Sequence, residues 1–143
     1  MTAPVEVEVA GLPAPQGSKV RTRYGMREAS KAVGPWRDAV RTECQKVMGE
    51  RPPLGCPVVV HIEFRLPRPK NHFGSGRNAG IVKASSPLFP AGQPDLDKLC
   101  RAVLDGLTAG GAWNDDGQVV HLHASKDYAD GTRPGCRVRI GEA

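Results

Sequence analysis

The sequence predicts an α+β fold, a small mixed sheet packed by two helices, from three observations. Apolar residues alternate with polar ones over residues 4–10 and 57–66, which is the period of a half-buried strand. They recur every three or four residues over 35–48 and 96–109, which is the period of an amphipathic helix. The chain has 143 residues, enough for one domain and too few for two of ordinary size. We therefore expect a single domain over residues 1–143.

The first half of the chain contributes two strands and one helix. Residues 4–10 (PVEVEVA) carry valine at every second position and predict the first strand. The Gly- and Pro-rich stretch 11–34 predicts a basic loop with room for a short hairpin. Pro35 suits the first turn of a helix, and Gly49 ends it. Residues 57–66 (PVVVHIEFRL) predict the second strand.

The second half contributes a long loop, a helix and two strands. Residues 67–94 have no clear period and no acidic residue, which predicts a long basic loop, a flexible flap that contacts phosphates. The helix over 96–109 is closed by two glycines, and residues 118–126 and 136–140 read as strands. The order β, α, β, α, β, β is that of an α+β fold. The expected buried stripe of the second helix is Leu96, Leu99, Val103 and Leu107.

Composition and charge exclude several classes of protein. The formal net charge of +5 favours an anionic partner, most commonly nucleic acid. No apolar run approaches the roughly 20 residues that a membrane helix needs. The N-terminal residues lack the basic start and apolar core of a signal peptide, so we expect a cytoplasmic protein. The four cysteines form no CxxC pair, which argues against a structural zinc site.

The charge is unevenly distributed. Residues 1–94 carry 14 Lys and Arg against 7 Asp and Glu, whereas residues 95–143 carry 6 against 8. Two stretches of the basic part contain almost no acid, so we expect their cations to contact DNA phosphates. These candidates are Lys19, Arg21, Arg23, Arg27 and Lys31 in the first stretch, and Arg68, Lys70, Arg77 and Lys83 in the second.

Five aspartates fall within 22 positions, in two groups joined by a helix; they are Asp95, Asp97, Asp105, Asp115 and Asp116. If the strand after the second group runs back beside the helix start, three or four carboxylates converge. Converging carboxylates repel unless a cation lies among them, and their oxygens select Mg²⁺ or Mn²⁺. The alternative is that Asp97 only caps a helix and that residues 114–117 only form a turn.

Metals of this kind support phosphodiester hydrolysis, which also needs a cation near the reacting phosphate. Arg101 lies one helical turn beyond Asp97 on the same helix face. It is the candidate for stabilising charge that develops on the phosphorus, and Lys98 is the second.

The segment PDLDKLCRAVLDGLTAGGAWNDDGQVV, residues 94–120, resembles the RusA-type Holliday-junction resolvases of phages and prophages. The pattern of that family runs roughly D-x-D-N-x-x-K-x-x-x-D-x-L, followed after a short gap by W-x-D-D-x-Q-V. Asp95, Asp97, Asp105, Asp115, Asp116, Gln118 and Val119 match it in order. A weaker likeness covers residues 15–21, a Pro–Gln–Gly–Ser element followed by basic residues, and the Trp36–Arg37 pair.

The resemblance implies a homodimeric, Mg²⁺-dependent enzyme that nicks branched DNA symmetrically. It also implies that Asp95, Asp97 and Asp116 are metal ligands, with Asp115 beside them. Two positions depart from the pattern, because Lys98 replaces the family asparagine and Arg101 its lysine. Arginine keeps the charge but cannot donate a proton, so a general acid would be Lys98 or absent.

The sequence therefore leaves two functions open, a structure-selective DNA endonuclease and a non-catalytic DNA-binding protein whose acids serve caps and turns. Of the aromatic residues, Trp36 is expected in the core. Trp113 is expected to pack the acidic turn or to stack on DNA bases. His121 and His123 are expected on an outward strand face rather than at a metal.

Overall fold

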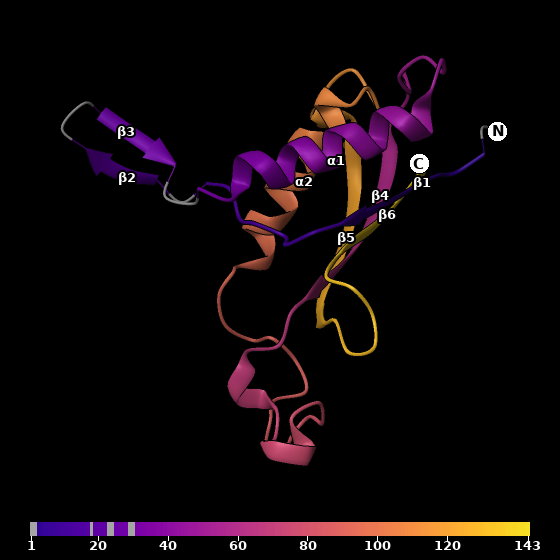
Figure 1. Ribbon diagram of the computed structural model, residues 1–143. Helices are drawn as coiled ribbons and strands as arrows, with labels where there is room; N and C mark the ends of the chain where they lie inside the picture. Colours follow the sequence, from indigo (N-terminus) through magenta and orange to yellow (C-terminus); the bar gives the residue numbers. More distant parts are fainter. Residues whose placement is uncertain (1–2, 18, 23–24, 29–30) are drawn as a thin grey trace.

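The computed structural model describes residues 3–17, 19–22, 25–28 and 31–143, with backbone alone over 19–22 and 25–28. It confirms the α+β class, because a four-stranded mixed sheet in the order β1–β6–β4–β5 has two helices on one face (Figure 1). A separate hairpin joins β2 and β3. The elements are β1 (Val5–Ala10), β2 (Lys19–Thr22), β3 (Gly25–Glu28), α1 (Val33–Met48), β4 (Val58–Leu66), α2 (Leu96–Ala109), β5 (Val119–Tyr128) and β6 (Gly135–Glu142).

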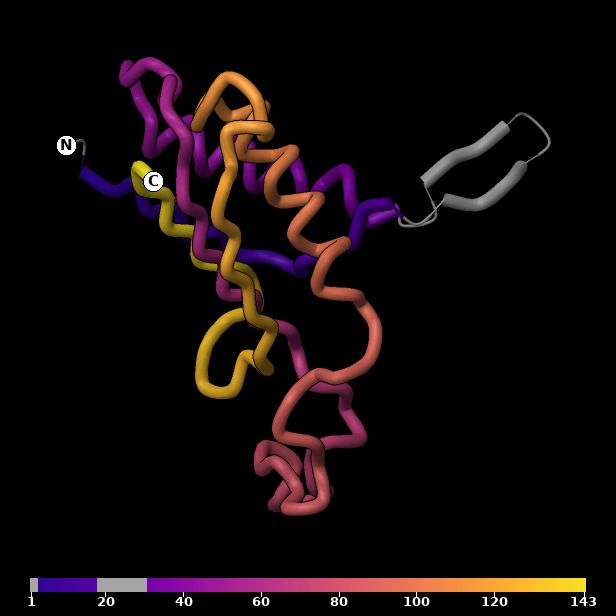
Figure 2. The backbone as a smooth tube through the Cα atoms, turned by 180° about the vertical axis from the view of Figure 1, so that it is seen from behind, coloured from indigo at the N-terminus to yellow at the C-terminus, as the bar shows by residue number. Residues whose placement is uncertain are grey.

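The sheet places α2 beside β5. β6 runs antiparallel to both of its neighbours, with Val138 opposite Val7 on β1 and Ile62 on β4. β4 and β5 pair in parallel, with His61 opposite His123. Parallel neighbours require a crossover connection, and α2 is part of that crossover. Figure 2 shows from behind how α2 lies along β5.

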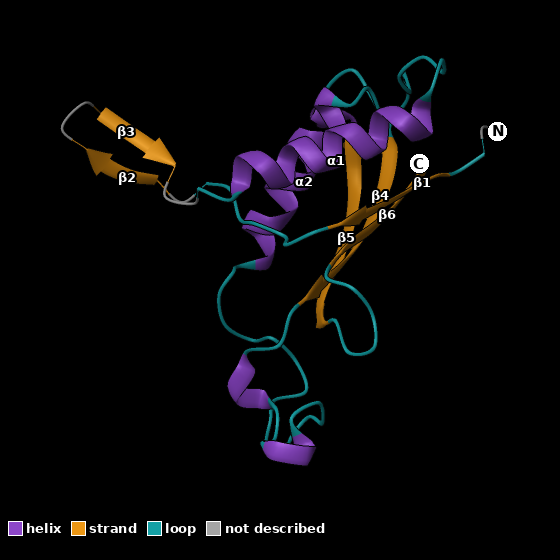
Figure 3. Ribbon diagram, in the orientation of Figure 1, coloured by secondary structure: helices purple, strands orange, loops and turns teal. Residues whose placement is uncertain are grey.

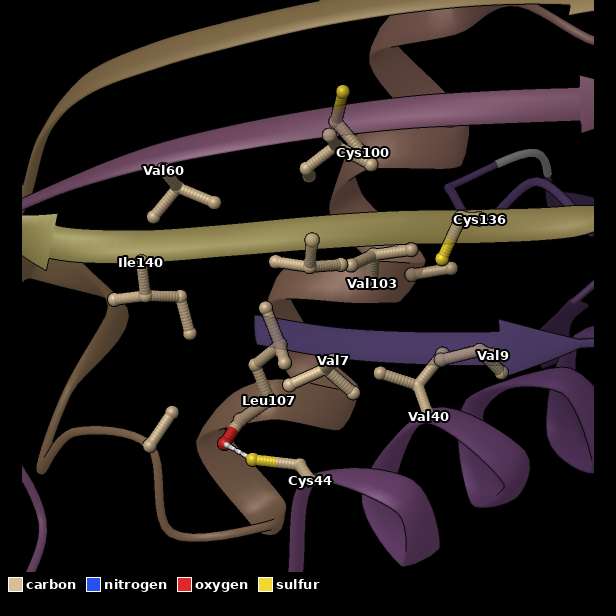
Figure 4. Packing of buried hydrophobic residues seen from close by; sticks show 14 of the residues in the cluster. Val7, Val9, Val40, Cys44, Val60, Cys100, Val103, Leu107, Cys136 and Ile140 are labelled. Carbon is tan, nitrogen blue, oxygen red and sulfur yellow. Dashed lines mark hydrogen bonds between the residues drawn. The ribbon is translucent and has the colours of Figure 1, made fainter. Parts of the chain in front are cut away.

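The core lies between the helices and one face of the sheet. Strand residues that recur with a period of two form its sheet side, and helix residues that recur with a period of 3.6 form its helix side. The valines of β1 are at most 1% exposed, and its glutamates point to the other face. Leu99, Val103 and Leu107 of α2 are fully buried, and Figure 4 shows Val103 and Leu107 packed on the sheet side of the helix. Burying each such side chain contributes about 1.5–3 kcal/mol. Leu96, expected in this stripe, is only half buried.

The two helices approach closely because α2 has glycine where α1 crosses it. A Cβ atom on Gly106 would lie 2.8 Å from the Cβ of Val40 and 3.0 Å from the carbonyl oxygen of Arg37. A larger residue would push the helices apart. Trp36, on the same side of α1, is 3% exposed, which confirms its predicted place in the core.

Residues 67–94 form a long connection between β4 and α2 that is mostly loop and is folded into a lobe (Figure 3). The lobe contains two short 3₁₀ turns, Lys70–His72 and Gly76–Asn78, and a bridge between Phe73 and Val82. Its two ends are held by contacts with β5 and the turn that follows it. The sequence could not indicate these contacts because their partners lie far along the chain.

Arg68 anchors the lobe. Its guanidinium donates to both carboxylate oxygens of Asp130 at 2.7 and 2.9 Å, and to the carbonyl oxygen of Pro87 at 2.7 Å. It also lies 4.1 Å from the ring centroid of Tyr128. The side chain is only 4% exposed. Arg68, a predicted DNA contact, therefore has a structural role here.

Candidate functional site

An acidic groove runs between α2 and β5. Three charged residues of α2 line it, Asp97, Arg101 and Asp105, because spacing of four residues places them on one helix face, away from the buried stripe. Leu122 and Ala124 of β5 form the opposite wall, and Asp116 lies at the turn that enters β5. The groove has a volume of about 680 Å³. Asp97 and Asp116, predicted from the two acidic groups, thus line one groove.

Asp116 is surrounded by negative charge. Partial desolvation raises the pKa of its carboxyl, and so do the hydrogen bond and charge of Asp115 and the charge of Asp105. All three effects disfavour the ionised carboxylate at this position. A cation in the groove would relieve this repulsion.

The two adjacent aspartates of the turn have different surroundings. The Asp115 side chain accepts the backbone N–H of Gln118, and the Gln118 amide oxygen accepts the backbone N–H of Asp115 at 3.0 Å. The Gln118 amide nitrogen also donates to the carbonyl oxygens of Leu54 and Cys56, at 2.8 and 3.0 Å. Asp115 and Gln118 therefore fix the turn to the strand side of the fold, and Asp116 is left facing the groove.

At the other end of the groove, Asp95 occupies the N-cap position of α2 but makes no side-chain capping bond. Its carboxylate lies 3.6 Å from the Lys98 ammonium. The Lys126 ammonium of β5 donates to the carbonyl oxygens of Gly92 and Pro94, at 2.7 and 2.8 Å, and so fixes the segment before the helix. Neither Asp95 nor Lys98 lines the groove.

The carboxylates are spread along the groove. The helical rise separates Asp97 from Asp105 by about 12 Å along the axis of α2. Within the described ranges, no three His, Cys, Asp or Glu side chains lie together as a metal centre. The donor set still fits Mg²⁺, because this ion commonly uses one or two carboxylates and takes its other ligands from water and substrate phosphate.

The predicted DNA contacts fall into three groups. Lys31, Lys70, Arg77 and Lys83 are exposed. Lys19, Arg21 and Arg27 lie on the hairpin strands, where the structure describes the backbone alone, and Arg23 lies outside the described residues. Among the predicted residues whose side chains the structure describes, Arg68 is the one whose side chain is nearly buried.

The remaining aromatic and histidine residues do not border the groove. Trp113 is 1% exposed and donates its indole N–H to the Thr108 hydroxyl at 2.8 Å, so it packs the turn rather than presenting a surface to DNA. His121 and His123 are exposed on β5, as predicted. The imidazole rings of His61 and His123 stack with centroids 4.7 Å apart.

Two residues near the groove were not predicted as site residues. The first is Asp105. The four-residue spacing from Asp97 to Arg101 continues to Asp105, and this spacing was the signal that could have predicted it. Gln16 donates from its side-chain amide to Asp105 across 89 residues of sequence. The only signal for Gln16 was its place in the Pro–Gln–Gly–Ser element.

Comparison with known proteins identifies the family. A search of curated proteins gave no match. The family model described as endodeoxyribonuclease RusA matches residues 10–141, which include both helices, β4, β5, almost all of β6 and the whole acidic groove, but only the last residue of β1. Within the described residues, neither helix has the length and hydropathy needed to cross a bilayer. With this match over almost its full length, the chain belongs to the RusA endodeoxyribonuclease family.

Proposed function

We propose that this protein is a Mg²⁺-dependent, structure-selective endodeoxyribonuclease that resolves Holliday junctions by paired, symmetric nicks. The observation that carries the proposal is the acidic groove, in which Asp97 and Asp116 lie with an arginine between α2 and β5. A cation between the carboxylates of the groove and a DNA phosphate would relieve their mutual repulsion. The family supports hydrolysis of DNA as the reaction class.

Asp97 and Asp116 are the proposed principal metal ligands, with Asp95 and Asp115 beside them as further oxygen donors. The bound ion, Mg²⁺ or Mn²⁺ in its place, would activate water and neutralise the scissile phosphate. The carboxylate oxygens would hold the ion in the groove. Three leucine side chains, Leu96, Leu104 and Leu122, add apolar surface to the walls of the groove.

Arg101 has the proposed role of stabilising charge that develops on the phosphate. It cannot serve as a general acid, because an arginine side chain keeps its proton in proteins. Lys98 is the proposed alternative for proton donation to the leaving oxygen, and its contact with Asp95 places its ammonium at the helix start. In this proposal, Arg101 would stabilise charge and Lys98 would donate the proton, in place of the single lysine of the family pattern.

The cations predicted to contact DNA are proposed to hold the arms of the junction. The proposed set, without the buried Arg68, is Lys19, Arg21, Arg23, Arg27, Lys31, Lys70, Arg77 and Lys83. Resolution takes two matched nicks, which a homodimer with twofold symmetry supplies. The four cysteines are all free thiols, which suits a reducing cytoplasm such as that of a bacterial host.

The test is nicking of a synthetic four-way junction with Mg²⁺ by the wild type and by the Asp97→Asn and Asp116→Asn variants. Both variants should lose nicking, because each removes a ligand charge. Both should bind the junction as well as the wild type or more tightly, because carboxylates repel phosphates. Asp38→Asn, on the exposed face of α1 and outside the groove, is the matched control and should cut normally.

Two results would overturn the proposal. If Asp97→Asn and Asp116→Asn both cut at the wild-type rate, the assignment of the ligands is wrong. If the wild type binds junctions but never nicks them with Mg²⁺ or Mn²⁺, the second candidate function holds, that of a non-catalytic DNA-binding protein.

A further inference from the structure

The segment before the β2–β3 hairpin lies against α2 and contacts two residues that line the groove, Arg101 and Asp105. The backbone N–H of Gln16 donates to the carbonyl oxygen of Lys98 at 3.0 Å, which ties the segment to the first turns of the helix. Ala14, two residues earlier, is 3% exposed and belongs to the core. Residues 14–17, which we call the strap, are therefore held against α2 by the backbone and by burial.

The Gln16 side chain joins two charged residues of opposite sign. Its amide oxygen accepts a hydrogen bond from the Arg37 guanidinium of α1 at 2.6 Å. Its amide nitrogen donates to the Asp105 carboxylate of α2. A primary amide can accept from one group and donate to the other at once, whereas a carboxylate cannot donate and an alkyl group can do neither. Arg37 thus sets which way round the amide lies.

The strap also touches Arg101. Gly17 has a φ of +107°, which side chains rarely allow, and a Cβ atom there would lie 2.5 Å from Nη1 of Arg101. The guanidinium therefore lies directly against the strap backbone, and glycine leaves room for it.

The spacing of Arg101 from two aspartates on the helix favours ion pairs, but these ion pairs do not form. Asp97 and Asp105 each lie four residues away, which is the spacing of stabilising helix ion pairs. Across the part of the chain that the structure describes, the ion pairs include neither Arg101–Asp97 nor Arg101–Asp105. Asp105 is instead bonded to Gln16.

We propose that Gln16 is a positioning residue that holds Asp105 away from Arg101, so that the Arg101 guanidinium stays available for a DNA phosphate in the groove. The neutral amide satisfies the Asp105 carboxylate without adding a positive charge that would compete for the phosphate. The inference rests on the proposed function in one respect, that the ligand of Arg101 is a phosphate of branched DNA. It extends the site to the N-terminal strap, outside the acidic segments.

The experiment measures binding of a four-way junction in EDTA as a function of salt, where nicking plays no part. Each phosphate contact contributes about 0.9 to the slope of log affinity against log salt. Gln16→Ala should weaken binding and reduce the slope by about that amount, because Asp105 then pairs with Arg101. Gln45→Ala, an exposed glutamine on α1, is the matched control and should bind as the wild type does.

Two double variants separate positioning from a merely structural role. Gln16→Ala combined with Arg101→Gln should bind no more weakly than Arg101→Gln alone, because the two changes remove the same contact. Gln16→Ala combined with Asp105→Asn should recover the lost slope, because the competing carboxylate is gone. Gln16→Glu keeps the contact with Arg37 but cannot donate to Asp105. It should behave as Gln16→Ala does, and it replaces that variant if the alanine protein does not fold.

The inference is overturned if Gln16→Ala and Gln16→Glu keep the wild-type salt slope, or if the losses from Gln16→Ala and Arg101→Gln add. Its failure is distinguishable from failure of the nuclease proposal. A wild type that never nicks, combined with the expected binding cycle, removes the nuclease and keeps the role of Gln16. If nicking is normal and depends on Asp97 and Asp116, but the losses of binding from Gln16→Ala and Arg101→Gln add, the nuclease proposal holds and the role of Gln16 is removed.

Discussion

Among single residues, Asp116 carries a charge that its surroundings oppose. Its neighbours Asp115 and Asp105 and its partial desolvation all raise the pKa of its carboxyl. A carboxyl whose pKa is higher in the folded than in the unfolded protein destabilises the fold once it is ionised, so the free energy of unfolding falls as the pH rises through that pKa. A carboxyl in a groove with a pKa shifted in this way is typical of a functional site.

Asp116→Asn should therefore raise the thermal stability of the metal-free protein at neutral pH, although the proposed function requires the same change to abolish nicking. The gain should shrink as the pH falls to about 3, where the aspartate is protonated in both states and resembles asparagine. Thermal unfolding of both proteins in EDTA, followed across this range of pH, measures the difference. Equal melting temperatures at neutral pH would show that the carboxylates do not interact in the folded protein.

Among elements, α2 has two faces with different tasks. One face buries Leu99, Val103 and Leu107 against the sheet, and the other carries Asp97, Arg101 and Asp105 into the groove. Gly106 fixes the distance at which α1 crosses this helix. Because the strap bonds to Arg37 of α1 and Asp105 of α2, any change in the helix crossing also moves the contact between the strap and the groove.

Gly106→Ala should destabilise the protein by about 1–3 kcal/mol, since the added methyl group overlaps Val40. Alanine gains about 1 kcal/mol of helix propensity, which offsets part of the loss. Gly34→Ala in α1 is the matched control, because a Cβ atom there meets nothing within 4 Å. It should be neutral or stabilising. Urea unfolding of the three proteins checks the order, and a stabilised Gly106→Ala variant would contradict the close helix contact.

Over the whole molecule, the charges on the open face of the sheet are arranged differently from those at the lobe and the groove. On the sheet face that carries no helix, arginines of β4 and β6 pair with glutamates of β1: Arg65 with Glu8, and Arg139 with Glu6 at 3.1 Å. The lobe over 67–94 contains no acidic residue at all. Phosphates are therefore expected at the lobe and the groove rather than at the open sheet face.

The triple variant Lys70→Gln, Arg77→Gln and Lys83→Gln should weaken junction binding and make its salt dependence less steep by roughly 2–3 in slope. The corresponding triple variant of the sheet side, Arg133→Gln, Arg137→Gln and Arg139→Gln, removes the same charge and should change the slope much less. Binding titrations from about 50 to 200 mM salt compare them. Equal losses for the two variants would mean that net charge, not the lobe, governs the affinity.

Much of the fold could be predicted from the sequence because its signals are local. The period of the buried residues predicted the bounds of α2 to the residue. It predicted the bounds of the strands of the sheet to within about two residues. The lobe was different, because its order depends on Arg68 reaching Asp130, 62 residues later. Contacts between charged side chains at that distance leave no periodic trace in the sequence.

The candidate site was predicted in part. The spacing of Asp97 and Arg101 on one helix face follows from helix geometry, and both line the groove. The adjacent aspartates 115 and 116 look equivalent in sequence, and only the turn geometry gives one a capping bond and the other a place in the groove. Gln16 could not be assigned, because its role depends on two helices that meet only in the folded protein.

The interior position of β6 has a consequence for synthesis of the protein. β6 is the last of the described strands in the chain, yet it lies between β1 and β4 in the sheet. Until the ribosome has released it, β1 has no partner in the sheet, and β4 has β5 alone. The nascent polypeptide therefore exposes unpaired strand edges and has no complete sheet against which α2 can pack. An unfinished chain should have no assembled groove, so a nuclease of this design becomes competent to cut DNA only after nearly all of the described residues have left the ribosome.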